Sequence, residues 1–352
     1  MDLSLVFALV IVCGIIIYVL ADGFDLGVGI LFLLAPRDAD RDLMMESISP
    51  FWDGNETWLV AGGTLLLAAF PPGYYILLPA LYVPIILMLF ALILRGVAFE
   101  FRFQASRFRR AWDYAFAGGS LLAAMAQGFV LGGFIQGVPV QNGMFAGGTF
   151  DFLSIIGLLC AAGLVAGYAL LGAAWLIWKT ADSTQTFGRE VAHAALLLTM
   201  AMMALVSLWT ALTEPEVAAR WFAWPRIMPQ ALLPLAAAAT AFLLWRNLWT
   251  NREVMPFLLA MALFLFGFAG LGVSLWPYVV PRQFTIHQAA ADPATLHVLI
   301  YGVAIILPII LAYTAHAYWV FRGKTSPDGP AIRIPALAAR RPACLDTELH
   351  LT

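Results

Sequence analysis

The chain has 352 residues, of which 62% are hydrophobic and 11% are charged, and its formal net charge is −2. Its mean hydropathy is +0.87, whereas soluble domains are about 45–50% apolar and about 25% charged. A core of this length cannot bury so much apolar surface, so lipid must solvate most of it. These values exclude a soluble enzyme, a nucleic-acid binder and a disordered scaffold, and they predict a polytopic membrane protein.

The chain contains nine apolar stretches that predict membrane-spanning helices. A span needs about 20 mostly apolar residues, and helices satisfy the backbone hydrogen bonds of such segments in lipid. The stretches cover residues 3–34, 57–72, 75–98, 115–136, 152–178, 191–212, 229–249, 254–278 and 297–321. The predicted fold is therefore an all-α membrane protein, in which 57–72 is the weakest span because it is short.

The distribution of basic residues predicts the orientation of these spans. With nine helices and the N-terminus outside, only Arg220, Arg226 and Arg282 fall on the outer side, and Arg95 lies within a span. The other basic residues gather on the inner side, as the positive-inside rule requires. We therefore expect a periplasmic N-terminus and a cytoplasmic C-terminus.

The ends of the chain and its cysteines predict few further features. The first 20 residues lack the basic start and cleavage site of a signal peptide and are expected to remain as a first helix. The polar, proline-containing tail at 325–352 is expected to be disordered and cytoplasmic, which leaves 1–324 as the membrane domain.

Cys13, Cys160 and Cys344 are too far apart for a metal or redox motif, and no disulfide is expected.

Tryptophans and tyrosines near the predicted span ends are interpreted as aromatic belts at the membrane surfaces. They include Trp52, Trp58, Trp112, Trp175, Trp178, Trp221, Trp276, Tyr318 and Trp319.

The segment ADGFDLGVG places two carboxylates inside the first span. Asp22 and Asp25 are three residues apart and therefore share a helix face. Gly23, Gly27 and Gly29 around them allow close approach of another helix. The pair is either a set of interfacial or packing groups, or a proton-handling pair, since two close carboxylates disfavour double ionisation.

A second acidic group, in PFWDGNETW, precedes the second span. Asp53, Asn55 and Glu56 could cap a helix start, where negative charge is favoured, or could form a proton entrance. The flanking Trp52 and Trp58 place the group at the membrane edge, and the sequence leaves the two interpretations equal.

Other polar residues give weaker signals. Arg95 and Glu100 at the end of the third span are five residues apart, so a direct pair is uncertain, and Arg95 is expected to reach toward the inner surface. The histidines are not paired at metal-ligand spacing within any span, so this chain is expected to ligate neither metal nor haem; they are His193, His287, His297, His316 and His350.

Several strings resemble one known family, the subunit II of cytochrome bd-type quinol oxidases, including the cyanide-insensitive branch. They are ADGFDLGVG, PFWDGNETWLVAGG and RGVAFEFRF, supported by PYVVP and the segment from TLHVLIYG to YWVFRGK. The resemblance covers about residues 3–324. It implies two four-helix bundles plus one peripheral helix, which agrees with nine spans.

The resemblance also implies a function. A larger subunit I would carry the quinol site, two haems b and one haem d, and the complex would oxidise quinol and reduce dioxygen to water in the bacterial inner membrane. This chain would stabilise that complex and ligate no haem. The sequence leaves open which quinone is used, whether a structural quinone binds here, and whether small accessory subunits join the complex.

By motif position, Asp22, Asp25 and Asp53 match family carboxylates associated with a proton route from the cytoplasm, and Glu56 lies beside them. Asp53 is expected to receive protons and Asp22 or Asp25 to pass them toward the partner subunit, which makes the reaction electrogenic by uptake. The sequence departs from the family at His287 and Gln288, where we expect Trp and a polar or acidic residue.

Two alternatives remain at this point. A proton-coupled secondary transporter also uses buried carboxylates in glycine-containing helices, although no inverted repeat is evident. A purely structural subunit would use the same carboxylates for packing alone.

Overall fold

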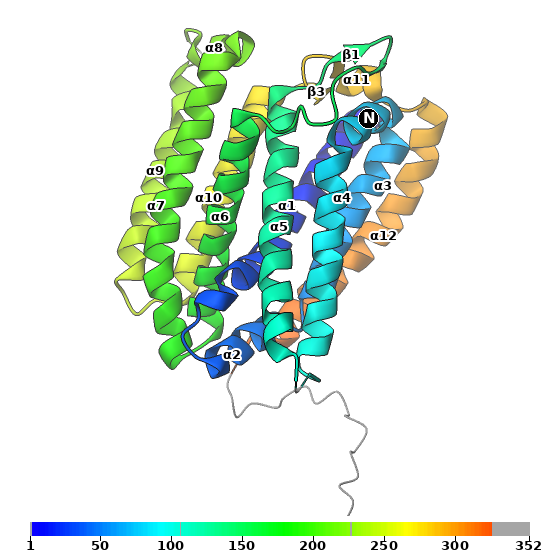
Figure 1. Cartoon of the computed structure of the whole chain (residues 1–352). Coiled ribbons are helices and arrows are strands. Elements are labelled where there is room, and N and C mark those ends of the chain that lie inside the picture. Colours follow the sequence, from blue (N-terminus) through cyan, green and yellow to red (C-terminus); the bar gives the residue numbers. More distant parts are fainter. Residues whose placement is uncertain (1, 106, 226, 326–352) are drawn as a thin grey trace, which may run out of the picture.

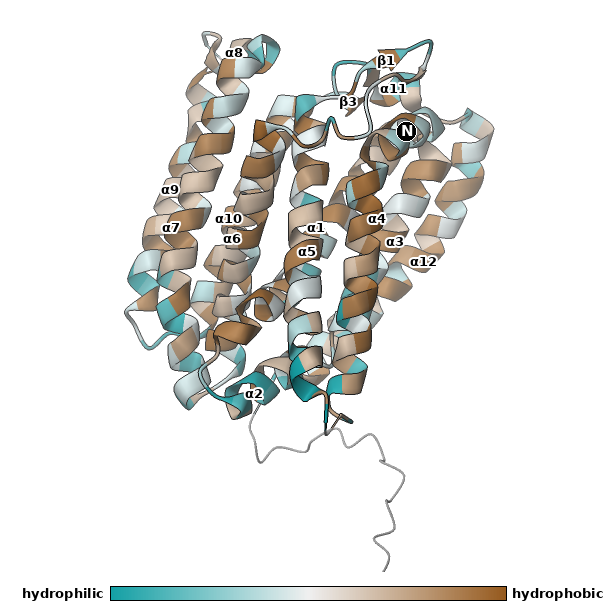
Figure 2. Cartoon of the chain, in the orientation of Figure 1, coloured by the Kyte–Doolittle hydropathy of each residue, from teal (hydrophilic) through white to brown (hydrophobic). Residues whose placement is uncertain are grey.

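The computed structural model describes residues 2–105, 107–225 and 227–325, so Arg226 and the predicted tail from 326 onward lie outside the described residues. Its helices stand side by side as a slab (Figure 1). Hydrophobic residues occupy the middle of the slab and polar residues its two ends (Figure 2), as expected for a protein that crosses a bilayer. We call these the α2 end and the α8 end.

The first bundle consists of α1 (Leu3–Leu31), α3 (Trp52–Ala69), α4 (Pro71–Arg102) and α5 (Arg109–Gln136). A 3₁₀ turn (Phe32–Leu34) extends α1, and α2 (Asp38–Ile48) follows it. Pro79 and Pro84 lie inside α4, and the helix kinks at Leu81, because proline removes a backbone donor and crowds the preceding turn.

The second bundle consists of α6 (Ile155–Lys179), α7 (Asp182–Thr213), α9 (Ile227–Leu248) and α10 (Val254–Leu275). The bundles meet where α1 and α5 pack against α6. The last long helix, α12 (Pro293–Val320), lies outside both bundles beside α3 and is the orange helix at the edge of Figure 1. The prediction of two four-helix bundles plus a peripheral helix is therefore confirmed.

Short elements close the α8 end. They are α8 (Pro215–Phe222), α11 (Ile286–Ala289), the hairpin of β1 (Val140–Gln141) with β2 (Met144–Phe145), and the hairpin of β3 (Tyr278–Val280) with β4 (Phe284–Thr285). Both hairpins are antiparallel, and β1 pairs Val140 with Phe145. The turn between β1 and β2 places Asn142 and Gly143 at positive φ, as such tight turns require.

Among the described residues, eight helices are long and apolar enough to cross a membrane. The ninth expected span, at 57–72, corresponds to α3, which has 18 residues and begins with the polar segment WDGNET. It nevertheless runs alongside α4 and α12 (Figure 1). Apolarity identified the other eight, whereas the short polar helix α2 had no counterpart in the sequence-based prediction.

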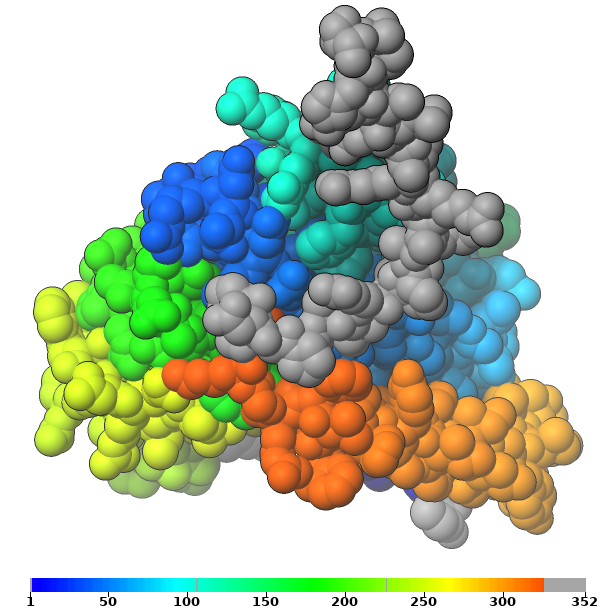
Figure 3. All heavy atoms as spheres, turned by 90° about the horizontal axis from the view of Figure 1, so that it is seen from below, coloured from blue at the N-terminus to red at the C-terminus, as the bar shows by residue number. Residues whose placement is uncertain are grey.

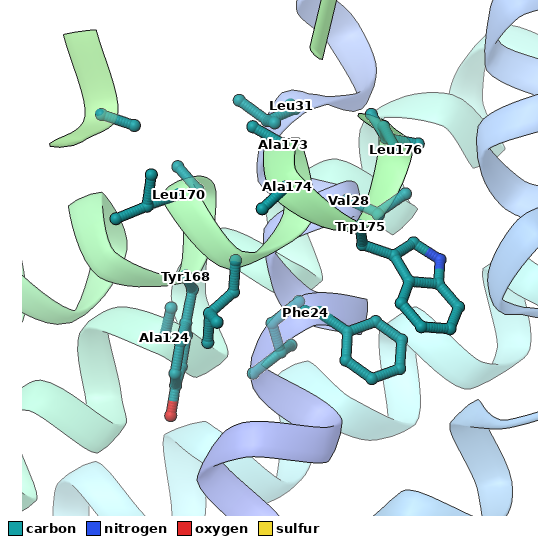
Figure 4. Close-up of a cluster of buried hydrophobic side chains, with 14 of the residues drawn as sticks. Phe24, Val28, Leu31, Ala124, Tyr168, Leu170, Ala173, Ala174, Trp175 and Leu176 are labelled. Carbon is teal, nitrogen blue, oxygen red and sulfur yellow. The ribbon is translucent and has the colours of Figure 1, made fainter. Parts of the chain in front are cut away.

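The contact between the two bundles depends on small residues. Gly27 of α1 lies directly against the backbone of Tyr168 and Gly172 on α6, and a Cβ there would overlap the Tyr168 carbonyl oxygen. Beside this contact, Phe24 stacks on Trp175 with ring centroids 4.0 Å apart (Figure 4). Glycine thus lets two helices meet at backbone distance, and aromatic rings fill the space next to them.

We expect Gly27→Val to separate α1 from α6 and to lower the yield and melting temperature of the protein in detergent. Gly118→Val is the matched control, because a Cβ at this glycine of α5 meets nothing within 4 Å. Equal melting temperatures for the two variants would contradict the close-packing account.

Asp40 fixes α2 to the second bundle. Its carboxylate accepts hydrogen bonds from Arg37 at 2.9 Å, from the Ser183 hydroxyl at 2.7 Å and from the Thr184 hydroxyl at 2.9 Å. These donors, Arg37 above all, hold the pKa of Asp40 at about 2, below its usual value of 3.8.

Because the folded-state pKa is depressed, the ionised Asp40 stabilises the fold above about pH 4, and this stabilisation is lost as the pH falls toward about 2. We expect Asp40→Asn to melt below the wild type at neutral pH, with a difference that shrinks across this acid range. Thermal melting in detergent at a series of pH values measures it, with the exposed Asp38→Asn as control. A difference that grows on acidification would contradict the assignment.

Candidate functional site

A group of charged side chains lies buried inside the first bundle, toward the α2 end. Asp22 and Asp25 on α1 are both 0% exposed, and Arg95 on α4 is 2% exposed. Arg95 Nη2 lies 2.8 Å from Asp22 Oδ1 and also forms an ion pair with Glu56 of α3. The arginine therefore connects three helices through their carboxylates, instead of reaching toward the membrane surface as the sequence suggested.

Asn55 of α3 holds the second aspartate. Its amide nitrogen donates to Asp25 Oδ2 at 2.7 Å and to the Ala21 carbonyl at 3.3 Å, while its amide oxygen accepts from the Tyr318 hydroxyl of α12 at 3.1 Å. Asn55 is therefore not a helix cap, and α3 begins after Phe51 with no side-chain cap at all. The peripheral helix α12 is tied to the site through Tyr318.

The charges in this buried group do not balance. Asp22, Asp25 and Glu56 supply three carboxyl groups, and Arg95 is the one cation that contacts any of them among the described residues. Both oxygens of Asp22, Oδ1 of Asp25 and Nη1 of Arg95 lack a hydrogen-bond partner of ordinary geometry within the described part of the chain. A buried excess of carboxylates is costly, so such a group favours binding a proton.

Glu56 connects this interior to the surface. Its side chain is 27% exposed, compared with 1% for that of Asp22. Asp53, three residues earlier on α3, is exposed and lies outside the buried group. The structure thus brings together Asp22, Asp25, Asn55, Glu56 and Arg95 and leaves Asp53 on the surface, outside this group.

The remaining predicted site residues have other positions. Glu100 is exposed and does not approach Arg95. Gly23 faces the Tyr168 ring and Gly29 faces Ser120, so the glycines bring α1 against α6 and α5. The tryptophan belt prediction is wrong for Trp58 and Trp175, which are 2% and 0% exposed in the bundle interior. Trp52 is half-buried against Phe99.

Sequence reasoning missed several polar residues near the site. Gln127 of α5 hydrogen-bonds both Tyr18 and Tyr168, and Tyr318 reaches Asn55. Gln127 lies in the middle of an apolar span, where an amide is costly to bury, as an ionisable group is. This polar amide in an apolar span is the sequence signal that identifies Gln127.

A second ion network lies at the α2 end, outside the candidate site. Arg102 is buried and contacts Asp42 at 2.7 Å and Asp113 at 2.5 Å, and Arg109 also pairs with Asp42. Each cation has a carboxylate partner, so we interpret this network as the connection that holds α2 against α4 and α5.

The comparisons with known proteins agree with this architecture. The family model described as cytochrome bd terminal oxidase subunit II matches residues 3–321. The chain belongs to that family.

Relatives within the family span nearly the whole chain. Cytochrome bd-I ubiquinol oxidase subunit 2 of Escherichia coli K12 is 29% identical, and the match covers 87% of this chain and 91% of that protein. Cytochrome bd ubiquinol oxidase subunit 2 of Bacillus subtilis is 25% identical, with 88% and 93% covered. The solved bd oxidase of Geobacillus thermodenitrificans matches with a TM-score of 0.75 at 17% identity, over 91% of this chain and 99% of that chain, which shows the shared fold.

The described residues include His, Cys, Asp and Glu, the donor types that metal ions need. No cluster of three or more His, Cys, Asp or Glu side chains could hold a metal ion there. His193 is bonded to the Arg189 carbonyl between Trp245 and Trp249, His297 is bonded to the Pro293 carbonyl, His287 lies by Asp2, and His316 is exposed. His350 lies outside the described residues.

We expect Arg95→Met to destabilise the protein strongly, because it leaves buried carboxylates without their cation, a change that typically costs about 3–5 kcal/mol. Arg110→Met, at an exposed arginine, is the control. Thermal melting of the detergent-solubilised complex measures the effect. If Arg95→Met melts with the control, the buried ion pairs do not stabilise the fold.

Proposed function

We propose that this chain, together with a haem-bearing subunit I, oxidises quinol and reduces dioxygen to water, and that its buried carboxylates line the proton-uptake route of that reaction. Family membership supports the oxidase and disfavours a secondary transporter. The relatives named above are ubiquinol oxidase subunits, which supports quinol as the electron donor. Haems b and d in subunit I would supply the oxygen chemistry, and this chain would lie in the bacterial inner membrane.

The observation that carries the proposed route is the unbalanced buried group of three carboxyl side chains around one arginine. Reduction of dioxygen to water consumes one proton for each electron, and these protons must cross apolar protein to reach a haem. Asp53 is exposed, Glu56 is partly exposed, and Asp22 and Asp25 are buried. The exposed fraction of the carboxyl side chains therefore decreases from the α2 end toward the bundle interior, as a proton-uptake route requires.

Arg95 has a specific role in this proposal. Its fixed positive charge stabilises carboxylates in the bundle interior, and the surplus of carboxyl groups over arginines leaves room for a mobile proton. Asp25, which Asn55 positions by a single amide donor, is the group from which a proton would pass to the partner subunit. With the α2 end in the cytoplasm, as the positive-inside rule predicts, uptake through this route makes the reaction electrogenic.

We expect Asp22→Asn, Asp25→Asn and Glu56→Gln complexes to lose oxygen-reductase turnover by roughly tenfold or more, as is typical when a proton-transfer group is removed. Asp53→Asn should have a smaller effect, because water reaches Glu56 directly. Rates are measured with an oxygen electrode and expressed per haem, so that impaired assembly is not counted as slow turnover. Glu216→Gln, an exposed residue at the α8 end, is the control.

Full turnover per haem in all three buried-site variants would overturn the proton route and leave a structural role for the carboxylates. A purified chain that binds no haem-bearing partner would overturn the oxidase assignment itself.

A further inference from the structure

Three polar side chains form a hydrogen-bonded chain across the contact between the two bundles. The Tyr168 hydroxyl of α6 donates to Gln127 Oε1 at 2.6 Å, and Gln127 Nε2 of α5 donates to the Tyr18 hydroxyl oxygen of α1 at 2.8 Å. Their exposed fractions are 0%, 8% and 4%, respectively. Figure 4 shows the Tyr168 ring extending from α6 beside Ala124, among apolar neighbours.

The direction of these hydrogen bonds leaves the O–H of Tyr18 without an acceptor within the chain of three residues. The Tyr18 oxygen accepts from Gln127, so the Tyr18 O–H can donate to a further acceptor. Asp22 lies one helical turn farther along α1, four residues after Tyr18, and both residues are buried. Neither Asp22 oxygen has a hydrogen-bond donor of ordinary geometry among the described residues, although Arg95 lies beside one of them, so Asp22 has acceptor capacity to spare.

We infer that Gln127 is a positioning residue for Asp22: it holds the Tyr18 hydroxyl oxygen as an acceptor and leaves the Tyr18 O–H free to donate to the ionised Asp22 carboxylate one turn away. The Gln127 amide also closes the proton path on the α6 side. The inference rests on the proposed function, because it deepens the role of Asp22 in that route. It adds Tyr18 and Gln127 to the residues that control the route.

The Gln127 amide does not readily pass a proton from Tyr18 to Tyr168. A hydroxyl or carboxyl group passes a proton by accepting one and releasing another at the same oxygen. Gln127 accepts at Oε1 and donates from Nε2, so passing a proton through it requires the unfavourable imidic acid tautomer. A proton that reaches Asp22 therefore continues toward its neighbour Asp25 and not toward Tyr168.

Packing alone does not explain the three polar groups. Burying hydroxyl and amide groups is costly unless each finds a partner, and apolar side chains of similar size would fill the same space. Tyr168 also stacks on Phe264, with centroids 5.9 Å apart, an interaction that phenylalanine would make equally well. The hydroxyls therefore serve the hydrogen-bonded connection that positions the Tyr18 hydroxyl, one turn before Asp22.

The test compares Tyr18→Phe, Gln127→Leu and Tyr168→Phe in the complete oxidase complex. We expect turnover per haem to fall roughly threefold to tenfold in Tyr18→Phe, which removes the donor to Asp22, and about twofold to fivefold in Gln127→Leu. Tyr168→Phe should retain more than about half of the wild-type rate, because the amide already ends the path. Tyr82→Phe, at an exposed tyrosine of α4, is the control and should be unchanged.

Infrared difference spectroscopy of the reduced and oxidised complex separates positioning from packing. The bands that Asp22→Asn removes belong to Asp22, and we expect them to shift in Tyr18→Phe and Gln127→Leu but not in Tyr168→Phe. A packing defect would lower haem content without moving these bands. If Gln127→Leu does not assemble, Tyr18→Phe, which keeps the ring, carries the test.

The outcomes distinguish this inference from the proposed function. Slow turnover in Asp22→Asn with wild-type rates and unshifted bands in Tyr18→Phe and Gln127→Leu overturns the inference alone. If turnover per haem is as low in Tyr168→Phe as in Tyr18→Phe, the claim that the proton path ends at Gln127 is overturned. Full turnover in Asp22→Asn overturns both the proton route and the inference.

Discussion

The first bundle depends on the ion pairs that one buried arginine of α4 forms with carboxylates on two other helices. Arg95 contacts Asp22 of α1 and Glu56 of α3, and Asn55 next to Glu56 holds Asp25 of α1. Charged groups this deep in a membrane protein persist when they are paired and functional. One cation faces three carboxyl groups. The contacts that fix the helices therefore also leave more buried carboxyl groups than arginines, and the excess carboxyl groups can bind a proton. Stability and the proposed proton transfer therefore share one set of atoms.

The rest of the fold brings these groups together and shields them from lipid. Glycines such as Gly27 let α1 lie against α6, and α3 and α5 also pack against α1, so the first helix lies at the centre of the molecule. At the α2 end, Lys179 of α6 donates to the Phe321 carbonyl at 2.6 Å and fixes the end of α12. Figure 3 shows this red-orange end reaching toward the yellow turn between α9 and α10, where Lys324 pairs with Glu253 at 2.6 Å. The peripheral helix is thus held at that end by the second bundle and, through Tyr318, by the candidate site.

Much of this architecture could be predicted from sequence because apolar length alone identifies spans in a lipid solvent. The i,i+3 spacing of Asp22 and Asp25 placed them on one face, and their cost in lipid indicated a special role. The partner of Asp22 could not be predicted, since Arg95 is 73 residues away and the pairing depends on how α4 packs against α1. Glu100 is five residues from Arg95, a spacing that does not place the two on one helix face, and in the structure it is exposed. Gln127 was overlooked because its importance depends on two tyrosines from other helices.

The most direct test of the account is the proton uptake that accompanies a single reaction of the fully reduced complex with dioxygen, followed with a pH-indicator dye. The account predicts that Asp25→Asn slows proton uptake and the oxidation of the haems together, while electron entry from quinol keeps its wild-type rate. Proton uptake at the wild-type rate in that variant, with normal haem content, would contradict the claim that the buried carboxylates of this subunit carry protons.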